Sequence, residues 1–249
     1  NYGVGYSHID LPSAQKLGIC VTNTPDVLSD CTADIAMTLM LMAARRAGEG
    51  ERELRAKKWG GWRPTHMIGA KVTGKTLGII GFGRIGQAMA SRGHFGFGMK
   101  IKIFSRSQVS AELLERYNAE QFNSVETLIR KSDFVSLHCP GGTSNRHLIN
   151  ASNLAQARPE LVLINTARGE VIDEVALANA LENKTIKAAG LDVFDGEPNI
   201  NPNLMTAPNL VMLPHLGSAT RETREEMGFR ALANCRAFFE GETPMDKVA

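Results

Sequence analysis

Three segments in the second half of the chain carry side chains whose types could react together. They contain Arg168, Glu197 and His215. An arginine can hold a carboxylate through two parallel hydrogen bonds, and a histidine can donate a proton to a ketone oxygen near neutral pH. A carboxylate beside that histidine orients the ring and favours its protonated form. These side chains therefore suit hydride addition to a small 2-keto acid, whose carboxylate must be held while its ketone oxygen gains a proton.

Each of these residues also has an ordinary structural explanation when it is considered alone. Arg168 could belong to a structural ion pair, Glu197 could be an exposed loop acid, and His215 could be a hydrogen-bonded structural histidine. Their shared position favours the chemical interpretation, because each follows an apolar run that predicts a strand. In an open α/β sheet, ligands bind beyond the carboxyl ends of the strands. We therefore expect the three side chains to meet at one edge of a sheet.

A glycine-rich segment at residues 81–86, which reads Gly-Phe-Gly-Arg-Ile-Gly, fits the GxGxxG pattern. It follows an expected strand and opens an expected helix, which is the context that a dinucleotide site needs. Gly81 permits a tight turn, Gly83 lets the backbone approach a pyrophosphate, and Gly86 lets the helix pack against the strand. The helix N-terminus offers unpaired N–H groups to the phosphates. The alternative is a glycine-rich turn that binds nothing.

The end of the next expected strand bears on the choice of cofactor. An NAD site usually places Asp or Glu about 20 residues beyond the glycines, where it binds the ribose 2′-hydroxyl. This chain has Ser105, Arg106 and Ser107 there. A guanidinium and two hydroxyls can hold a 2′-phosphate, which favours NADP. The alternative is that Arg106 is a solvated surface charge and that NAD is accepted.

The elements that must position these residues alternate between strand and helix from residue 75 onward. This rhythm predicts an α/β fold, a doubly wound parallel sheet with helices on both faces. Before it, we expect a strand at 19–22, a helix from 29 to 46 that Ser29 or Asp30 caps, further helix at 49–58 and an irregular loop at 59–64. The later strands are expected at 76–80, 101–104, 134–138, 161–165, 188–193 and 210–213, and the later helices at 85–94, 111–117, 125–131, 174–182 and 220–240.

Composition excludes several other classes of protein. The chain has 249 residues, 43% hydrophobic and 22% charged, which is ordinary for a globular protein. Its formal net charge of +2 gives no reason to expect nucleic acid as a partner, and no apolar run is long enough to span a membrane. The four cysteines form no CxxC pair and lie at no metal-ligand spacing from a histidine, so we expect reduced thiols, a cytoplasmic protein and no metal.

The order of these motifs resembles that of the D-isomer-specific 2-hydroxyacid dehydrogenases, and most of all the glyoxylate and hydroxypyruvate reductases among them. The resemblance runs nearly end to end. It includes Gly-Val-Gly-Tyr at 3–6, the run at 74–86, Asn-Thr-Ala-Arg-Gly-Glu at 165–170, Gly-Leu-Asp-Val-Phe at 190–194 and Pro-His-Leu-Gly-Ser at 214–218.

The resemblance implies a role for each matching position. Arg168 is expected to bind the substrate carboxylate and keto oxygen, His215 to be the acid/base paired with Glu197, and the backbone of Val4 and Gly5 to hold the carboxylate. Asp192 is expected to face the nicotinamide, although it could simply cap a strand end, and His138 is expected to be structural. The other expected cofactor contacts are Gly81, Gly83, Arg84, Ile85, Gly86, Ser105, Arg106, Ser107, Cys139, Pro140, Thr166, Ala167, Gly217 and Ser218.

The resemblance also implies two domains and a partner subunit. Residues 28–220 are expected to form the dinucleotide-binding domain, with 1–27 and 221–249 as parts of a discontinuous, flavodoxin-like substrate domain whose N-terminal part is missing. A homodimer is expected, with the helix near 29–46 and the arm through Trp59 and Trp62 at its interface.

The expected reaction is reduction of glyoxylate or hydroxypyruvate by NADPH, with NAD as the alternative cofactor. Another 2-hydroxy acid such as 3-phosphoglycerate remains an alternative substrate. A phosphate-bearing substrate needs extra cations near the site, and no basic cluster surrounds residues 3–5, although the missing N-terminal part could supply one. A second alternative is a dinucleotide-sensing protein resembling co-repressors, in which turnover is incidental.

Overall fold

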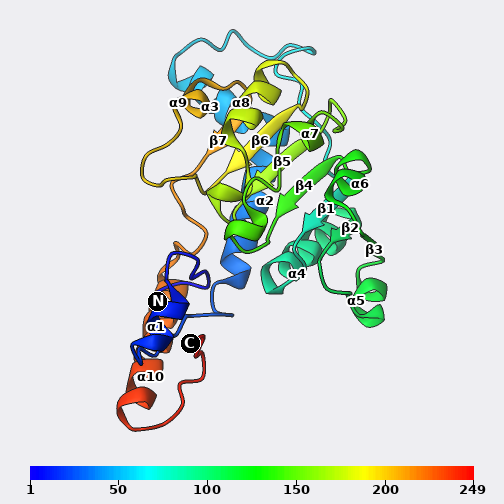
Figure 1. The fold of residues 1–249 in the computed structure, drawn as a ribbon. Coiled ribbons are helices and arrows are strands. Elements are labelled where there is room, and N and C mark those ends of the chain that lie inside the picture. The colour runs from blue at the N-terminus through cyan, green and yellow to red at the C-terminus, as the bar shows by residue number, and fades with distance from the viewer.

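The computed structural model describes residues 1–249 and contains one seven-stranded, wholly parallel sheet. The strand order is β3-β2-β1-β4-β5-β6-β7, which reverses direction between β1 and β4 (Figure 1). The predicted doubly wound α/β fold is therefore confirmed. The strands are β1 (Thr76–Ile80), β2 (Lys100–Phe104), β3 (Glu120–Phe122), β4 (Phe134–Leu137), β5 (Val162–Asn165), β6 (Ala188–Leu191) and β7 (Leu210–Met212).

Ten α-helices accompany the sheet, and none of them is long and apolar enough to cross a membrane. A π-helical turn, Arg92–Gly96, follows α4, so the helix predicted at 85–94 changes its winding before its expected end. The helices are α1 (Leu11–Lys16), α2 (Ser29–Arg45), α3 (Ala47–Arg55), α4 (Arg84–Ser91), α5 (Ala111–Arg116), α6 (Val125–Arg130), α7 (Ala151–Leu154), α8 (Glu174–Glu182), α9 (Pro202–Thr206) and α10 (Arg221–Phe239).

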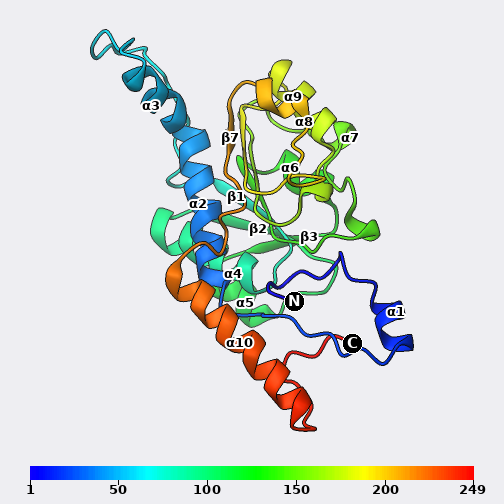
Figure 2. The ribbon, with the colours of Figure 1, turned by 90° about the vertical axis from the view of Figure 1, so that its left-hand side faces the viewer.

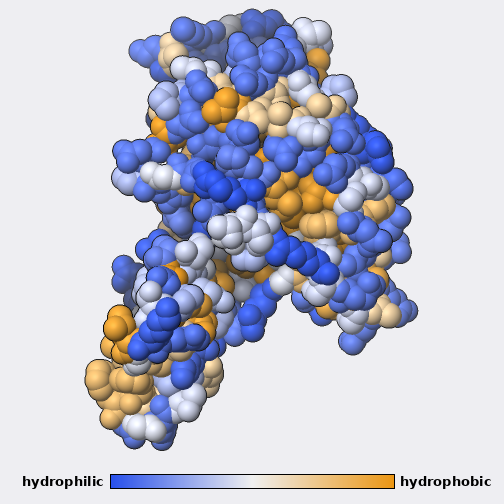
Figure 3. Space-filling model, viewed as in Figure 1, coloured by the Kyte–Doolittle hydropathy of each residue, from blue (hydrophilic) through white to orange (hydrophobic).

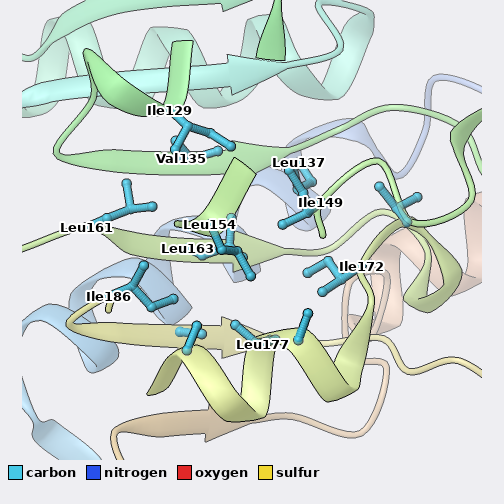
Figure 4. Close-up of a cluster of buried hydrophobic side chains, with 14 of the residues drawn as sticks. Ile129, Val135, Leu137, Ile149, Leu154, Leu161, Leu163, Ile172, Leu177 and Ile186 are labelled. Carbon is cyan, nitrogen blue, oxygen red and sulfur yellow. The ribbon is translucent and has the colours of Figure 1, made fainter. Parts of the chain in front are cut away.

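Two apolar layers hold the helices against the sheet. The central strands β1, β4, β5 and β6 are buried on both faces, which explains why most of their residues are apolar. Helices α2 and α4 cover one face. Helices α6, α7 and α8 cover the other, and Figure 4 shows Leu154 of α7 beside Leu163 of β5 and Leu177 of α8 beside β6. This packing fixes the strand ends from which the predicted reactive residues leave the sheet.

A smaller part of the molecule, the small lobe, consists of residues 1–27 and 221–249 and lies beside the carboxyl edge of the sheet (Figures 1 and 2). It brings the two ends of the chain together, with an antiparallel bridge between Thr22 and Lys247. The strand predicted at 19–22 is wrong, because this single bridge is the only ladder contact there and Ile19 is exposed. Figure 3 shows apolar surface on this lobe, and α10 contributes the exposed side chains Phe229, Leu232, Phe238 and Phe239.

Helices α2 and α3 meet at a sharp corner. Arg46 adopts a left-handed conformation with φ of 55°, so the predicted continuous helix is divided there, and α3 ends at Arg55. The predicted caps Ser29 and Asp30 are wrong, since both lie inside α2 and its N-cap residue is Leu28. Helix α3 and the chain that follows it project from the body on the side away from the small lobe (Figure 2).

Candidate active site

A cavity of about 420 Å³ lies between the small lobe and the carboxyl edge of the sheet, where the surface in Figure 3 is hollowed. The three predicted reactive residues line it together, although each follows a different strand. The predicted substrate-binding residues come from the small lobe and face the same space. Its lining includes Val4, Gly5, Arg168, Glu197 and His215.

Arg168 is directed across the cavity by the short segment that follows β5. The Nδ2 group of Asn165 donates to the Arg168 carbonyl at 2.8 Å, and the Ala167 N–H donates to Oδ1 of Asn165 at 2.9 Å. The guanidinium then lies against Gly5, so closely that a Cβ atom on Gly5 would overlap it. Its one hydrogen bond is to the Ala167 carbonyl, at 2.6 Å, and no carboxylate lies within ion-pair distance. The charge of Arg168 is therefore free to bind an anion, and the structural ion pair considered for it does not exist.

Glu197 and His215 form a pair on the loops after β6 and β7. The Nδ1 atom of His215 lies 2.8 Å from Oε2 of Glu197, while Oε1 accepts the Phe194 N–H at 2.8 Å. The backbone N–H of His215 donates to the Asp192 carbonyl at 2.9 Å, and the residue adopts a left-handed conformation with φ of 55°. Because Nδ1 is engaged, Nε2 is the ring atom available for proton transfer.

The loop that carries Glu197 is held by contacts that the sequence did not reveal. Gly169 packs so closely on the backbone of Phe194 and Asp195 that no side chain fits there. The buried carboxylate of Glu174 accepts the Asp195 N–H at 2.8 Å. Burial raises the pKa of Glu174, with that hydrogen bond opposing it. In the sequence Glu174 reads as an ordinary first-turn helix residue, so no pattern could have identified it.

Asp192 is a buried residue at the end of β6, and it also lines the cavity. Its carboxylate accepts the N–H groups of Leu216 at 2.7 Å and Gly217 at 2.8 Å. Burial raises the pKa of Asp192, while these two hydrogen bonds lower it. The carboxylate therefore holds the loop after His215, as the predicted strand-end cap would, while it remains next to the cavity.

The glycine-rich segment forms a cradle between β1 and α4. Gly81 has φ of 91°, and a Cβ atom there would come within 2.7 Å of the backbone of His138 and Cys139. Gly86 packs directly on the Gly81 carbonyl. Gly83 is the N-cap residue of α4, has open space where a side chain would lie and leaves the first N–H groups of the helix without a side-chain cap. This cradle fits the phosphates of a dinucleotide.

The predicted cofactor residues divide into two groups. Ile85, Thr166, Asp192, Gly217 and Ser218 line the same cavity as the reactive residues. The buried hydroxyl of Thr166 has no hydrogen-bond partner, which leaves it for a bound ligand. The others lie outside that cavity, and Arg84 forms an ion pair with Asp26. The residues outside are Gly81, Gly83, Arg84, Gly86, Ser105, Arg106, Ser107, Cys139, Pro140 and Ala167.

Two side chains at the end of β4 are unsuited to titration near neutral pH. Burial lowers the pKa of His138 to about 3, and its Nε2 atom lies 2.8 Å from the Ser136 hydroxyl. Burial raises the pKa of Cys139 to about 11, so this thiol stays protonated. Both features agree with a structural role for His138 and with an inert thiol at Cys139.

Comparison with known proteins adds the family. Residues 37–217 match the model of the D-isomer specific 2-hydroxyacid dehydrogenase NAD binding domain. The chain belongs to the D-isomer specific 2-hydroxyacid dehydrogenase family. It is therefore an NAD(P)-dependent oxidoreductase, and the reaction of this family interconverts 2-keto acids and D-2-hydroxy acids.

Similar members of this dehydrogenase family cover nearly all of the chain. A glyoxylate reductase from Thermococcus litoralis is 47% identical over 99% of this chain and 75% of its own. A glycerate dehydrogenase from Hyphomicrobium methylovorum is 41% identical over 96% of this chain and 74% of its own. An NADPH-dependent glyoxylate/hydroxypyruvate reductase from Sinorhizobium meliloti, solved with NADP and malonate, has a TM-score of 0.92 at 37% identity, covering 100% of this chain and 76% of that one.

Proposed function

We propose that this dehydrogenase reduces glyoxylate and hydroxypyruvate with NADPH to the corresponding D-2-hydroxy acids. The proposal rests chiefly on one observation. The Arg168 guanidinium, which has no carboxylate partner, lies in the same cavity as the hydrogen-bonded pair of Glu197 and His215. The names of the similar reductases and of the similar glycerate dehydrogenase support the same substrates.

The side chains of this chain divide the work of binding and proton transfer. Arg168 binds the substrate carboxylate and the keto oxygen, helped by the backbone N–H groups of Val4 and Gly5 across the cavity. His215 donates a proton from Nε2 to the ketone oxygen, and Glu197 orients the ring through Nδ1 and stabilises its cation. A bound nicotinamide supplies the hydride.

The cofactor is held by the cradle at 81–86 and by the ends of the neighbouring strands. Its phosphates bind the N-terminus of α4, and its 2′-phosphate binds Ser105, Arg106 and Ser107. No carboxylate lies within ion-pair distance of Arg106, which supports NADPH over NADH. Thr166, Asp192, Gly217 and Ser218 complete the nicotinamide end of the site.

The charges around the cavity favour a small substrate without a phosphate. Arg168 is the only arginine or lysine in its lining, whereas four carboxylates belong to it: Glu170, Asp192, Asp195 and Glu197. A phosphorylated acid such as 3-phosphoglycerate would bring a second anionic group with no cation to receive it. Glyoxylate and hydroxypyruvate carry a single carboxylate and avoid this cost.

The proposal also covers the domains of the chain, its assembly into a dimer and its location in the cell. Residues 28–220 form the dinucleotide-binding domain, and 1–27 with 221–249 belong to the substrate domain. The chain forms a homodimer through α2, α3 and the arm beyond them, where Trp59 and Trp62 are 52% and 82% exposed. It works in the cytoplasm, where its four free cysteines stay reduced.

Absorbance at the reduced-nicotinamide band tests the proposed reaction directly. Glyoxylate, hydroxypyruvate, pyruvate and a phosphorylated keto acid are each mixed with enzyme and with NADPH or NADH. The proposal expects fast NADPH oxidation with the first two substrates. Faster turnover with NADH would overturn the cofactor preference, and preference for the phosphorylated acid would overturn the substrate. Tight dinucleotide binding without turnover on any keto acid would favour the sensing protein instead.

A further inference from the structure

We infer that the 3₁₀ turn Thr143–Asn145 sets the cofactor preference of this enzyme by holding the Arg106 guanidinium in place for a 2′-phosphate. The inference rests on the proposed use of NADPH and adds to it two positioning residues, Ser144 and Asn145. They lie 38 and 39 residues beyond Arg106, on the chain that follows a different strand. Neither residue belongs to the glycine cradle or to the reactive cavity.

Three oxygen atoms of the turn bind the guanidinium. Nη2 of Arg106 donates to the Ser144 carbonyl at 3.0 Å and to Oδ1 of Asn145, and Nη1 donates to the Ser144 hydroxyl at 3.3 Å. Nε makes no hydrogen bond. Because the guanidinium is planar, bonds to both terminal nitrogens fix its orientation. A long side chain that would otherwise move between rotamers is thus ordered by the protein itself.

All three oxygen atoms belong to uncharged groups, so they orient the Arg106 guanidinium without neutralising its charge. A carboxylate in their place would compensate the positive charge of Arg106, as Asp26 does for Arg84 and Asp195 does for Arg146. A hydroxyl, a carbonyl and an amide oxygen orient the guanidinium and leave its charge available to a phosphate. The turn therefore holds Arg106 in the way that a phosphate-binding arginine requires.

The turn is itself anchored. Asn145 is only 4% exposed, and its amide has two partners, because Oδ1 accepts from Arg106 and Nδ2 donates to the Pro140 carbonyl at 2.7 Å. The N–H of Gly142 donates to Oε1 of Glu170 at 2.5 Å, which ties the start of the turn to the segment after β5. Asn145 thus joins Arg106 to the segment after β4, where Cys139 and Pro140 were predicted to line the cofactor site.

The backbone beside Arg106 is held from the opposite side. Nε2 of Gln121, on β3, donates to the carbonyls of Ser105 at 3.3 Å and Ser107 at 3.0 Å, and its Oε1 accepts the Val109 N–H at 2.9 Å. Gln121 therefore fixes the backbone on one side, while the turn fixes the guanidinium on the other.

Placing a carboxylate on the turn tests this inference. Ser144 is exposed, so Ser144→Asp adds a negative charge beside Arg106 with little risk to folding. The Kd of NADPH should rise about 10-fold, because a charge-assisted hydrogen bond is lost, while the Kd of NADH changes little. Asn201→Asp is the matched control, since it makes the same charge change at the N-cap of α9, where Asp caps as well as Asn. Both Kd values are measured by titrating nicotinamide fluorescence.

A double-mutant cycle separates positioning from direct repulsion. In an Arg106→Ala background, Ser144→Asp should no longer change the NADPH/NADH ratio of Kd values, because the side chain that it acts through is gone. A further loss of NADPH there would mean that the new carboxylate repels the phosphate directly, which overturns the inference. Asn145→Ala provides a second variant, which should raise this ratio in the native background and leave it unchanged without Arg106.

The outcomes for the inference and for the proposed function are distinct. If the native enzyme binds both cofactors equally and Arg106→Ala changes nothing, the proposed NADPH preference fails. If the native enzyme prefers NADPH and Arg106→Ala abolishes the preference, but Ser144→Asp and Asn145→Ala leave it intact, only the role of the turn fails.

Discussion

Glu197 divides its two carboxylate oxygens between the Phe194 N–H and the ring of His215. One oxygen therefore fixes the carboxylate to its own loop, and the other is committed to the imidazole. This arrangement holds the ring by one nitrogen and leaves the other for the substrate.

Removing the charge of Glu197 while keeping its shape should slow the chemical step. In Glu197→Gln, the amide oxygen can still accept the Phe194 N–H, but the carboxylate charge next to the imidazolium form of His215 is lost. We expect kcat to fall about 10²-fold, at the lower end of the range for general acid catalysis, with the Kd of NADPH unchanged. Steady-state rates and cofactor titration check this, with His215→Asn as the variant in which the proton donor itself is lost. An unchanged kcat in Glu197→Gln would contradict the role of the pair.

At the scale of elements, the turn after Arg168 and the loop after β6 are in direct contact through Gly169, where the backbone of Phe194 and Asp195 leaves no room for a side chain. The loop that carries Glu197 therefore depends on a glycine that neighbours Arg168. The residues proposed to bind the substrate and to orient the proton donor are thereby coupled through the backbone.

Two glycine substitutions should have opposite effects. Gly169→Ala should displace the loop that carries Glu197, lowering kcat and destabilising the fold by about 1–3 kcal/mol, as overpacking does. Gly228→Ala is the matched control, because Gly228 lies in α10 with open space around it and alanine is favoured in a helix by about 1 kcal/mol. Thermal unfolding and kcat together check both. A Gly169→Ala enzyme with native kcat would show that the loop can move aside freely.

The central strands could be predicted from the sequence because their burial shows directly in their own residues. Strands β1, β4 and β5 are buried on both faces, and most of their residues are apolar. Strand β3 was missed, since its three residues, Glu120–Phe122, sit at the sheet edge and two of them are polar. The segment 19–22 was predicted wrongly because only Val21 is buried there, Ile19 is exposed, and the segment makes a single bridge and joins no sheet.

In the candidate site, too, residues could be predicted where their own sequence context identifies them, whereas contacts between distant segments could not. Arg168, Glu197 and His215 could be proposed because each follows an apolar run that predicts a strand and because their side chains can take part in catalysis, and the structure places them in one cavity. The residues that accept hydrogen bonds from Arg106 were not predicted. Ser144 and Asn145 are distant from Arg106 in the sequence, and they come close to it only because of how the strands are ordered in the sheet. The ion pair between Arg84 and Asp26 was missed for the same reason, because it joins the cradle to a distant segment.

At the scale of the whole molecule, hydrogen bonds run from α10 to the segment that carries Val4, a residue that lines the cavity. Asn234 donates through Nδ2 to Asp246 at 2.9 Å, and the Asn23 N–H donates to the Asp246 carbonyl at 3.2 Å. Nδ2 of Asn23 then donates to the Val4 carbonyl at 2.9 Å. The far end of the chain therefore helps to hold the wall of the cavity that faces Arg168.

Asp246 should make the small lobe sensitive to acid. The Arg230 guanidinium beside it holds the pKa of this buried carboxyl below its ordinary value of 3.8. A lowered pKa in the folded state gives stability that is present above pH 3.8 and is lost as the pH falls through the folded pKa. Asp246→Asn should remove this dependence and cost about 1–3 kcal/mol at neutral pH. It should also raise KM for the keto acid while the Kd of NADPH stays unchanged.

Unfolding measured between pH 7 and pH 3 checks this prediction. Glu240→Gln serves as the control, because the Arg236–Glu240 pair is an exposed i,i+4 pair worth about 0.3–0.5 kcal/mol. Equal acid sensitivity in the native and Asp246→Asn proteins would mean that other carboxylates dominate.

The three reactive side chains stand on three separate loops, each leaving its own strand of a sheet that is buried on both faces. Substitutions in one loop can alter the shape of the cavity without repacking the apolar layers, whose side chains tolerate little change in volume. Substrate choice can therefore change through these loops at small cost to folding, because the sheet and its glycine cradle need not change with them.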